Sequence, residues 1–337
     1  MKKTVLVSGG NGFLATHIID QLLERDYQVK ASVRNEKSAT KLRTTLQENN
    51  TPRLNQLELF YADLLKDDGW ADAFKDVDYF LSVASPVFFG NADEEEQINV
   101  SKAGTLRLMG FAQAANVKKI VMTSNYGAIG FSSFDPNHLI NENDWTNINQ
   151  PGLSAYEKSK TLAEQAAWDF AKQNNLNLTT INPVAMFGPA LNNHISGSFD
   201  VLKTIVGSEM SVLPKINLNI VDVRDVATMH ILAMENDQST GERLIASAPG
   251  QISFQEMAQI IQETRPDLSK NLPKRTLPTW ALQIASHFNH AAREGLLLAK
   301  LNRQIDTTKA DRQLNFKSEH TNRDIVIASL DSLAANI

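Results

Sequence analysis

Seven residues near the start of the chain, Gly9 to Ala15, join a short apolar run to a helical pattern. The run from Thr4 to Val7 is typical of a buried strand, and the spacing that follows is typical of a helix. A glycine turn between the two lets backbone approach a pyrophosphate, whose charge is attracted by free N–H groups and by the helix dipole. The sequence therefore predicts a dinucleotide site, with these candidate cofactor-binding residues: Gly9, Asn11, Gly12, Phe13 and Leu14.

Two glycine registers fit this turn, Gly10-x-Gly12-x-x-Ala15 and Gly9-x-x-Gly12-x-x-Ala15. Both place Ala15 where the helix must pack closely on the strand. The strand before the turn and the helix after it are the context that a dinucleotide motif requires.

The composition excludes several classes of protein. The 337 residues, 42% of them apolar, can bury one large core or two unequal ones. The net charge of −5 and the scattered basic residues argue against a nucleic-acid surface. Because cysteine is absent, disulfides, thiolate metal sites and cysteine nucleophiles are excluded, and the seven histidines have no ligand-like spacing, so no metal site is expected.

The chain also lacks the signals of a membrane or secreted protein. No apolar run approaches the roughly 20 residues that span a bilayer. The apolar stretch behind Met1-Lys2-Lys3 stops at Ser8, which is too short for a signal peptide. We expect a cytoplasmic protein with no membrane partner.

Apolar, β-branched runs alternate with helical patterns over the first two-thirds of the chain. The predicted strands are 4–7, 28–33, 57–61, 79–83, 119–123 and 178–181. The predicted helices between them are 12–25, 38–49, 69–74, 95–115 and 155–173. Alternation of this kind predicts an α/β fold with a Rossmann-type, doubly wound parallel sheet.

After Phe187-Gly188-Pro189 the pattern loosens, and it returns to a strand-like run at 219–223 and a helix at 226–234. An amphipathic stretch and a long helical run follow, at 253–263 and 281–300. We therefore predict a dinucleotide-binding domain over 1–188, to which 219–235 return. Residues 189–218 and 245–305 are expected to form a smaller substrate-binding or lid region, and 306–337 a C-terminal segment.

The end of the second predicted strand indicates which nicotinamide cofactor binds. An acidic residue there would grip the 2′-hydroxyl of NAD. Instead the strand ends at Arg34, which suits a 2′-phosphate, and Lys41 adds a second cation from the next helix. NADP(H) is favoured, although Glu36 leaves NAD open. Asp63, after the third strand, either accepts from the adenine amino group or caps the next turn.

Tyr156 and Lys160 stand four residues apart at the head of a strongly helical stretch, so both project from one face. A free tyrosine has a pKa near 10 and is a poor acid–base catalyst at neutral pH. A neighbouring ammonium favours phenolate and is expected to lower that pKa. The pair therefore predicts a proton shuttle, and downstream of a dinucleotide motif it is typical of a reductase.

These motifs together resemble those of the extended short-chain dehydrogenase/reductases, and within them the dihydroflavonol reductase and cinnamoyl-CoA reductase group of carbonyl reductases. The resemblance covers most of the chain and rests on Val7 to Ala15, Val33-Arg34, Asp63-Leu64, Val83 to Pro86, Asn99 to Thr105, Met122 to Ser124, Tyr156 to Trp168, Asn182 to Pro189 and Asp306 to Ala310. It implies that Lys160 bonds the nicotinamide ribose. It further implies cofactor contacts for Leu64, Ala84, Ser85, Pro86 and Thr123, with Pro183 and Val184 facing the nicotinamide.

The third catalytic position departs from that family's pattern. The family carries Thr-Ser-Ser there, and its second serine bonds the carbonyl oxygen, whereas this chain has Thr123-Ser124-Asn125. An asparagine amide can donate to a developing oxyanion but cannot relay a proton. Either Asn125 replaces the serine or Ser124 takes its place. A second departure is Gly130, where plant flavonoid reductases carry a substrate-binding asparagine, so a flavonoid substrate is not expected.

We therefore expect an NADPH-dependent reductase of aldehydes or ketones, with hydride from the nicotinamide and a proton from Tyr156. Two rivals remain: a nucleotide-sugar epimerase or dehydratase with retained NAD, and a non-catalytic NADP-binding sensor or scaffold. The substrate should be a medium-sized, partly apolar carbonyl compound, selected by aromatic-rich segments around 88–89, 131–134, 186–199 and 280–288. A homodimer is possible, and the sequence does not decide it.

Overall fold

A parallel sheet of seven strands forms the centre of the protein, which we describe from a computed structural model. The structure describes residues 2–86, 93–192, 194–207, 212–270, 272–273, 275–277, 279–288 and 290–337. The strands run in the order β3-β2-β1-β4-β5-β6-β11, and every neighbouring pair is parallel. Their bounds are Leu57–Tyr61, Gln28–Val33, Thr4–Val7, Tyr79–Ser82, Lys119–Thr123, Leu178–Pro183 and Arg243–Ala246. This is the predicted Rossmann-type order.

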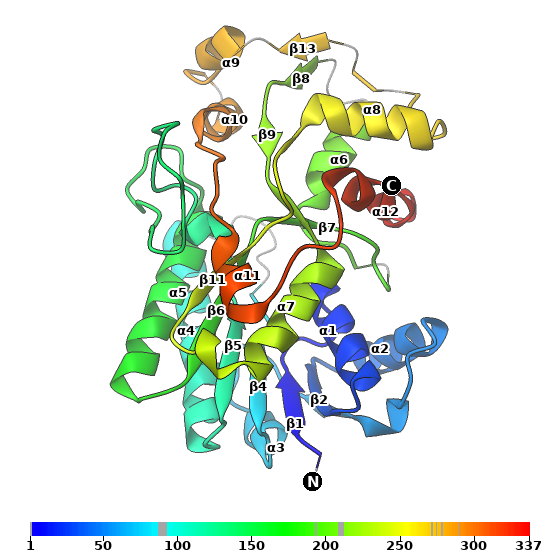
Figure 1. Ribbon diagram of the computed structural model, residues 1–337, viewed down its shortest axis with the longest axis vertical. Coiled ribbons are helices and arrows are strands. Elements are labelled where there is room, and N and C mark those ends of the chain that lie inside the picture. The colour runs from blue at the N-terminus through cyan, green and yellow to red at the C-terminus, as the bar shows by residue number, and fades with distance from the viewer. Residues whose placement is uncertain are drawn as a thin grey trace.

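Helices cover both faces of the sheet (Figure 1). Leu6 of β1 belongs to a core formed with α3, α4 and α5, while its neighbours Val5 and Val7 belong to a core formed with α1, α2 and α7. Alternate residues of a strand point to opposite faces, and a strand covered on both sides is apolar throughout. The helices are α1 Phe13–Glu24, α2 Glu36–Glu48, α3 Trp70–Phe74, α4 Glu94–Ala114, α5 Ala155–Gln173 and α7 Val223–Glu235.

The crevice that positions a cofactor in such a sheet lies between β1 and β4. The chain moves from β1 to β2 on one side and later returns to β4 on the other. The loops after β1 and β4 therefore diverge at the carboxyl ends of the strands, where ligands bind in open α/β sheets.

A smaller part of the chain lies beyond those carboxyl ends, at the end of the molecule farthest from the N-terminus (Figure 1). Its strands form two-stranded pairs, β7 with β10, β9 with β12 and β8 with β13. The strand bounds are β7 Ala185–Phe187, β8 Val212–Pro214, β9 Asn217–Leu218, β10 Ile220–Asp222, β12 Ile252–Ser253 and β13 Arg275–Leu277. Its helix bounds are α6 Phe199–Val206, α8 Phe254–Thr264, α9 Thr279–Ala285, α10 His290–Lys300 and α12 Asn322–Ala334. Helix α11, Thr308–Leu314, instead packs beside β11 and α7 of the sheet part (Figure 1).

Two elements differ from the sequence prediction. The strand β11 was not predicted, although its four residues are buried and complete the sheet beside β6. The long helical run is two helices, α9 and α10. The side chains of Ser286 and His287 both bond the carbonyl of Gln283, at 2.7 and 2.9 Å, and so compete with the helical hydrogen bond to that carbonyl.

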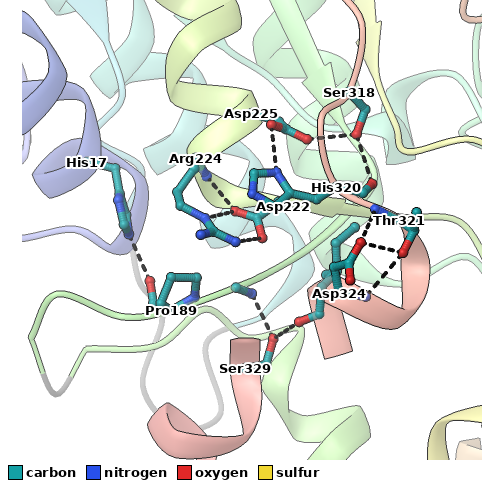
Figure 2. Close-up of polar contacts among 12 residues, drawn as sticks. His17, Pro189, Asp222, Arg224, Asp225, Ser318, His320, Thr321, Asp324 and Ser329 are labelled. Atoms are coloured by element: carbon teal, nitrogen blue, oxygen red, sulfur yellow. Dashed lines mark hydrogen bonds and ion pairs between the residues drawn. The ribbon is translucent and has the colours of Figure 1, made fainter. Parts of the chain in front are cut away.

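The C-terminal segment is fastened to the loop that leaves β7 and to the start of α7 (Figure 2). His320 Nδ1 lies 2.9 Å from Asp225 Oδ1, and the backbone N–H of Gly188 donates to Ser329 Oγ at 2.8 Å. These contacts fix the loop that runs from Gly188 toward α6. Among the helices of the described residues, none is long and apolar enough to cross a bilayer.

Candidate active site

The turn between β1 and α1 has the shape that a pyrophosphate requires. Gly9 has φ +72°, and a Cβ there would lie 3.1 Å from that of Ala84, so glycine fits without strain. Gly12 caps α1 without a side-chain hydrogen bond, and the first turn carries no acidic residue. The N–H groups of that turn form a ready anion site. The side chains of Phe13 and Leu14 are buried, so these residues can offer backbone there.

Cationic side chains gather beyond the end of β2. Arg34 and Lys41 are exposed, and neither has an ion-pair partner among the described residues. Burial lowers the pKa of the His194 imidazole, and the charges of Lys41 and Arg34 lower it further. Both cations therefore lie near His194. Glu36, the residue that left NAD open, accepts a hydrogen bond from Tyr61. The cations fit a 2′-phosphate, while the carboxylate is already engaged.

The remaining residues around the turn have structural partners. Asn11 Nδ2 donates to a backbone carbonyl in α2 at 2.8 Å, which ties the turn to that helix. Asp63 Oδ1 accepts from the N–H of Leu65 at 3.0 Å and so caps its own turn, the second interpretation offered from the sequence. Leu64 packs against Gly104, where an added Cβ would lie 2.9 Å from the Leu64 Cγ.

One small cavity at the ends of β4 and β5 brings several predicted residues together. It is lined by Leu64, Ala84, Ser85, Pro86, Thr123 and Lys160, among others. The hydroxyl of Thr123 lies 2.8 Å from His230 Nε2, on the side of α7. Pro183 and Val184 are buried where β6 ends, beside β11.

Tyr156 and Lys160 lie on successive turns at the start of α5, which Ser154 caps. Tyr156 is 48% exposed. Lys160 is half-buried, and its Nζ donates to Ser85 Oγ at 2.7 Å and lies 5.8 Å from the centre of the Tyr156 ring. The helix therefore brings ammonium and phenol to the same edge of the sheet, as the four-residue spacing predicts.

The expected lowering of the phenol pKa is not found. Despite the exposure of Tyr156, the surrounding protein disfavours phenolate and, with the carboxylate of Glu157, raises the pKa of Tyr156 to about 12. Burial lowers the pKa of Lys160 to about 8. The ammonium of Lys160 bonds Ser85 rather than the phenol, and so does not offset the two effects that raise the pKa of Tyr156. The phenol is thus held in its protonated form at neutral pH.

Asn125 and Ser124 point in different directions. Asn125 Nδ2 lies 3.4 Å from the Tyr156 hydroxyl, a long contact, and Asn125 Oδ1 accepts from the N–H of Gly127 at 2.5 Å. The second bond orients the amide so that its NH₂ group faces the phenol. Ser124 is 4% exposed and donates at 2.5 Å to Glu164, away from Tyr156.

Glu164 lies one turn beyond Lys160 on α5, and sequence reasoning did not select it. Its fully buried carboxylate accepts six hydrogen bonds from five residues: Ser124 Oγ (2.5 Å), Thr180 Oγ1 (3.1 Å), Asn182 Nδ2 (2.8 Å), Trp168 Nε1 (3.2 Å), and Arg243 Nε and Nη2 (2.7 and 3.4 Å). We call this cluster the Glu164 hub. The sequence did offer one signal for Glu164: it follows Tyr156 and Lys160 at the same interval of four residues.

The Glu164 hub also holds the backbone around Asn125. Asn182 Nδ2 donates to the carbonyl of Asn125 at 3.2 Å. Arg243 donates to the carbonyls of Glu142 and Asp144 at 2.9 and 2.7 Å, and its guanidinium stacks on Trp145. Buried hydrogen bonds therefore hold the loop that carries Asn125, and those donated by Arg243 are charge-assisted.

The aromatic residues expected on the substrate side fall into two groups. Phe131 is buried, whereas Phe134, Trp280 and Phe288 are 38%, 67% and 86% exposed. The segment 88–89 lies outside the described residues. At Gly130 an added Cβ would lie 2.2 Å from the Tyr126 ring, so that ring occupies the space of a larger side chain.

The sheet order, the glycine turn and the Tyr-x-x-x-Lys pair define a nicotinamide-dependent oxidoreductase. Residues 6–254 match the 3-beta hydroxysteroid dehydrogenase/isomerase family. The chain belongs to this family, and with it to the extended short-chain dehydrogenase/reductases.

Known relatives are similar over most of the chain. The NADPH-dependent methylglyoxal reductase of Saccharomyces cerevisiae is 30% identical over 299 residues, which cover 80% of this chain and 85% of the reductase. Cinnamoyl-CoA reductase 1 of Arabidopsis thaliana is 33% identical over 281 residues, covering 82% and 77%. The crystal structure of yeast methylglyoxal/isovaleraldehyde reductase complexed with NADPH superposes with a TM-score of 0.79 at 27% identity, covering 99% of this chain and 100% of that one.

Proposed function

We propose that the protein is an NADPH-dependent carbonyl reductase, which converts an aldehyde or ketone to an alcohol. The observation that carries the proposal is the meeting of the Tyr156 hydroxyl and the Asn125 amide, 3.4 Å apart, beside the half-buried ammonium of Lys160. The relatives named as methylglyoxal and cinnamoyl-CoA reductases support this reaction class.

NADP(H) is the cofactor. The residues that would hold it are the glycine turn at the pyrophosphate, and Arg34 and Lys41 at the 2′-phosphate. Their fit rests on the positive φ of Gly9, the uncapped first turn of α1 and the two cations without a carboxylate partner among the described residues. When bound, NADPH supplies the hydride for the carbonyl carbon. Everything else in the reaction falls to the chain's own residues.

Tyr156 is the proton donor in this proposal. Reduction consumes a proton at the carbonyl oxygen, and the phenol of Tyr156, whose pKa lies well above neutral pH, is protonated and can supply it. As the proton leaves, negative charge grows on the phenol oxygen. The role proposed for Lys160 is to stabilise that charge, which requires its ammonium to turn from Ser85 toward the phenol during the reaction.

Asn125 fills the third catalytic position in this proposal. Its NH₂ group is oriented toward Tyr156 by the hydrogen bond from Gly127 and can donate to the same carbonyl oxygen. Ser124 is assigned no contact with substrate, because its hydroxyl is buried and bonded to Glu164. The amide polarises and orients the carbonyl, and the proton comes from the phenol alone.

The substrate in this proposal is a small to medium carbonyl compound bound between the sheet and the lid region of residues 189–218 and 245–305. Methylglyoxal and isovaleraldehyde, named for the yeast relative, are the first candidates. A cytoplasmic location is a part of the proposal that rests on the sequence, which does not decide between a monomer and a homodimer.

The experiment that tests the function follows NADPH and NADH oxidation by absorbance. Methylglyoxal, isovaleraldehyde, aromatic aldehydes and diketones are the substrates, and the Tyr156→Phe variant is the blank. We expect turnover with NADPH that exceeds turnover with NADH by about tenfold or more, the factor expected of a charge-assisted phosphate contact. Tight NADPH binding without turnover of any of these compounds would overturn the assignment.

A further inference from the structure

A second polar cavity, of about 210 Å³, lies away from the catalytic residues. Tyr156, Lys160 and Asn125 do not line it. Its floor is buried and its mouth is exposed, and the polar residues around it are Asn219, Ser247, Gln251, Arg303, Gln304 and Thr307. A ligand of a few heavy atoms fits such a space.

Arg303 in the wall of this cavity has no counter-charge. No carboxylate of the described residues lies within ion-pair distance of it. Its guanidinium makes one hydrogen bond there, from Nη2 to the carbonyl of Leu298 at 3.3 Å, and Nε is buried without a partner. Burial accordingly lowers the pKa of Arg303. A desolvated cation without a partner is unfavourable, and an anion in the cavity would relieve that cost.

Asn219 in the floor adds an acceptor to this cation. It is 6% exposed, and its Nδ2 donates to the carbonyls of Gly250 and Arg303 at 3.1 and 3.2 Å. Its Oδ1 is buried without a partner. Buried polar atoms in native proteins are nearly all hydrogen-bonded. In the wall of the cavity, Arg303 therefore has no anionic partner, and Asn219 Oδ1 has no hydrogen-bond donor.

Tyr126 links the cavity to the catalytic loop. It directly follows Asn125, its hydroxyl is buried without a partner, and its phenol is close enough to Arg303 for each to shift the pKa of the other. The three unpartnered polar atoms therefore belong to neighbouring side chains rather than to scattered positions.

We propose that this cavity binds a small hydroxycarboxylate at a site separate from the catalytic cleft. The carboxylate pairs with the guanidinium of Arg303, and a hydroxyl donates to Asn219 Oδ1. A carboxylate is favoured because the arginine fork matches its two oxygens, and a hydroxyl because the remaining unpartnered atom in the floor is an acceptor.

The test is isothermal titration of the full chain, without cofactor, using lactate, propionate and 1-propanol as probes. Lactate carries both groups, propionate the carboxylate alone, and 1-propanol the hydroxyl alone. We expect lactate to bind more tightly than propionate and 1-propanol not to bind. Arg303→Met should weaken lactate about tenfold or more, as expected for loss of a charge-assisted hydrogen bond, and Arg303→Lys should weaken it less.

The matched control is Arg34→Gln, because the cations at the expected 2′-phosphate site could also hold an anion. Lactate binding that survives Arg34→Gln and is lost in Arg303→Met supports the proposal. Binding lost in the Arg34 variant but kept in the Arg303 variant would place the anion at the cofactor site and overturn it.

A second measurement needs no variant. The midpoint of thermal unfolding of the wild-type protein should rise with lactate and not with 1-propanol, at matched ionic strength, because only a ligand of the folded state stabilises it. The same midpoint in both solutions would overturn the proposal even if the Arg303 variants fail to fold.

Discussion

One helix, α5, carries two polar centres of opposite character. At its start, Tyr156 is 48% exposed, and its hydroxyl accepts a long hydrogen bond from Asn125. Two turns later the carboxylate of Glu164 is fully buried and accepts six hydrogen bonds. Lys160 lies between them and is half-buried.

The difference separates chemistry from support. At the first centre, the Tyr156 hydroxyl can still form a hydrogen bond with a substrate carbonyl. At the second centre, the Glu164 carboxylate already accepts hydrogen bonds from protein groups. It can therefore hold the neighbouring backbone in place, but it has few free lone pairs for a ligand. Changes at the start of α5 should therefore alter turnover, and changes at Glu164 should alter stability.

The largest expected effect is on stability, from Glu164→Gln. Removing one charge of a buried ion pair leaves Arg243 without a counter-charge, and should lower the free energy of unfolding by about 3–5 kcal/mol. Urea denaturation measures it. The matched control is Glu94→Gln, which breaks the surface ion pair with Lys158 and should cost less than about 1 kcal/mol. Equal losses in the two variants would contradict the contrast.

The next effect separates the neighbours Asn125 and Ser124. Asn125→Ala should lower kcat by about 10²-fold, as for loss of one oxyanion donor, and cost about 1 kcal/mol of stability, because the hydrogen bond from Gly127 is lost. Ser124→Ala should keep kcat and cost about 1–3 kcal/mol of stability, because it leaves an acceptor of Glu164 unpaired. Steady-state kinetics and urea denaturation on both variants decide. The reverse pattern would make Ser124 the catalytic residue.

A smaller effect concerns the cofactor. Arg34→Gln should raise KM for NADPH about tenfold and leave KM for NADH unchanged, because only NADPH carries the 2′-phosphate. Initial rates at varied cofactor concentration measure both constants. Arg25→Gln, at another exposed arginine, is the control and should change neither. A parallel rise for both cofactors would show that Arg34 does not read the phosphate.

The smallest effect is on the pH profile. If the ammonium of Lys160 is needed for turnover, kcat should hold constant below its pKa of about 8 and fall above it. At pH 8.5 roughly a quarter of the plateau should remain, the fraction still protonated half a unit above the pKa. Lys160→Arg stays charged and should move the fall to higher pH. A kcat that stays constant up to pH 10 would show that turnover does not need the positive charge of Lys160.

The sequence was most informative where local pattern decides structure. The strands and helices of the first two-thirds follow from apolar periodicity, and α5 has the predicted bounds. Strand β11 was missed because its four residues are too few for a periodic signal and its partner, β6, is distant in sequence. The break between α9 and α10 depends on two side chains bonding one carbonyl.

For the candidate site, it was easier to predict which residues take part than to predict where their side chains point. The positions of Tyr156 and Lys160 follow from helical spacing, but the lysine points to Ser85 and does not offset the desolvation and the Glu157 charge that raise the phenol pKa. Which of Asn125 and Ser124 faces Tyr156 depends on Glu164, forty residues downstream of the serine. Such long-range contacts carry no local pattern.

The most direct test of the contrast along α5 is kcat of Tyr156→Phe at saturating NADPH, measured on protein whose urea denaturation matches wild type. The account predicts a loss of about 10²-fold or more with unchanged NADPH affinity, because the phenol is the proton donor. A variant that keeps more than about a tenth of wild-type kcat would contradict it, since loss of a general acid should cost at least that much.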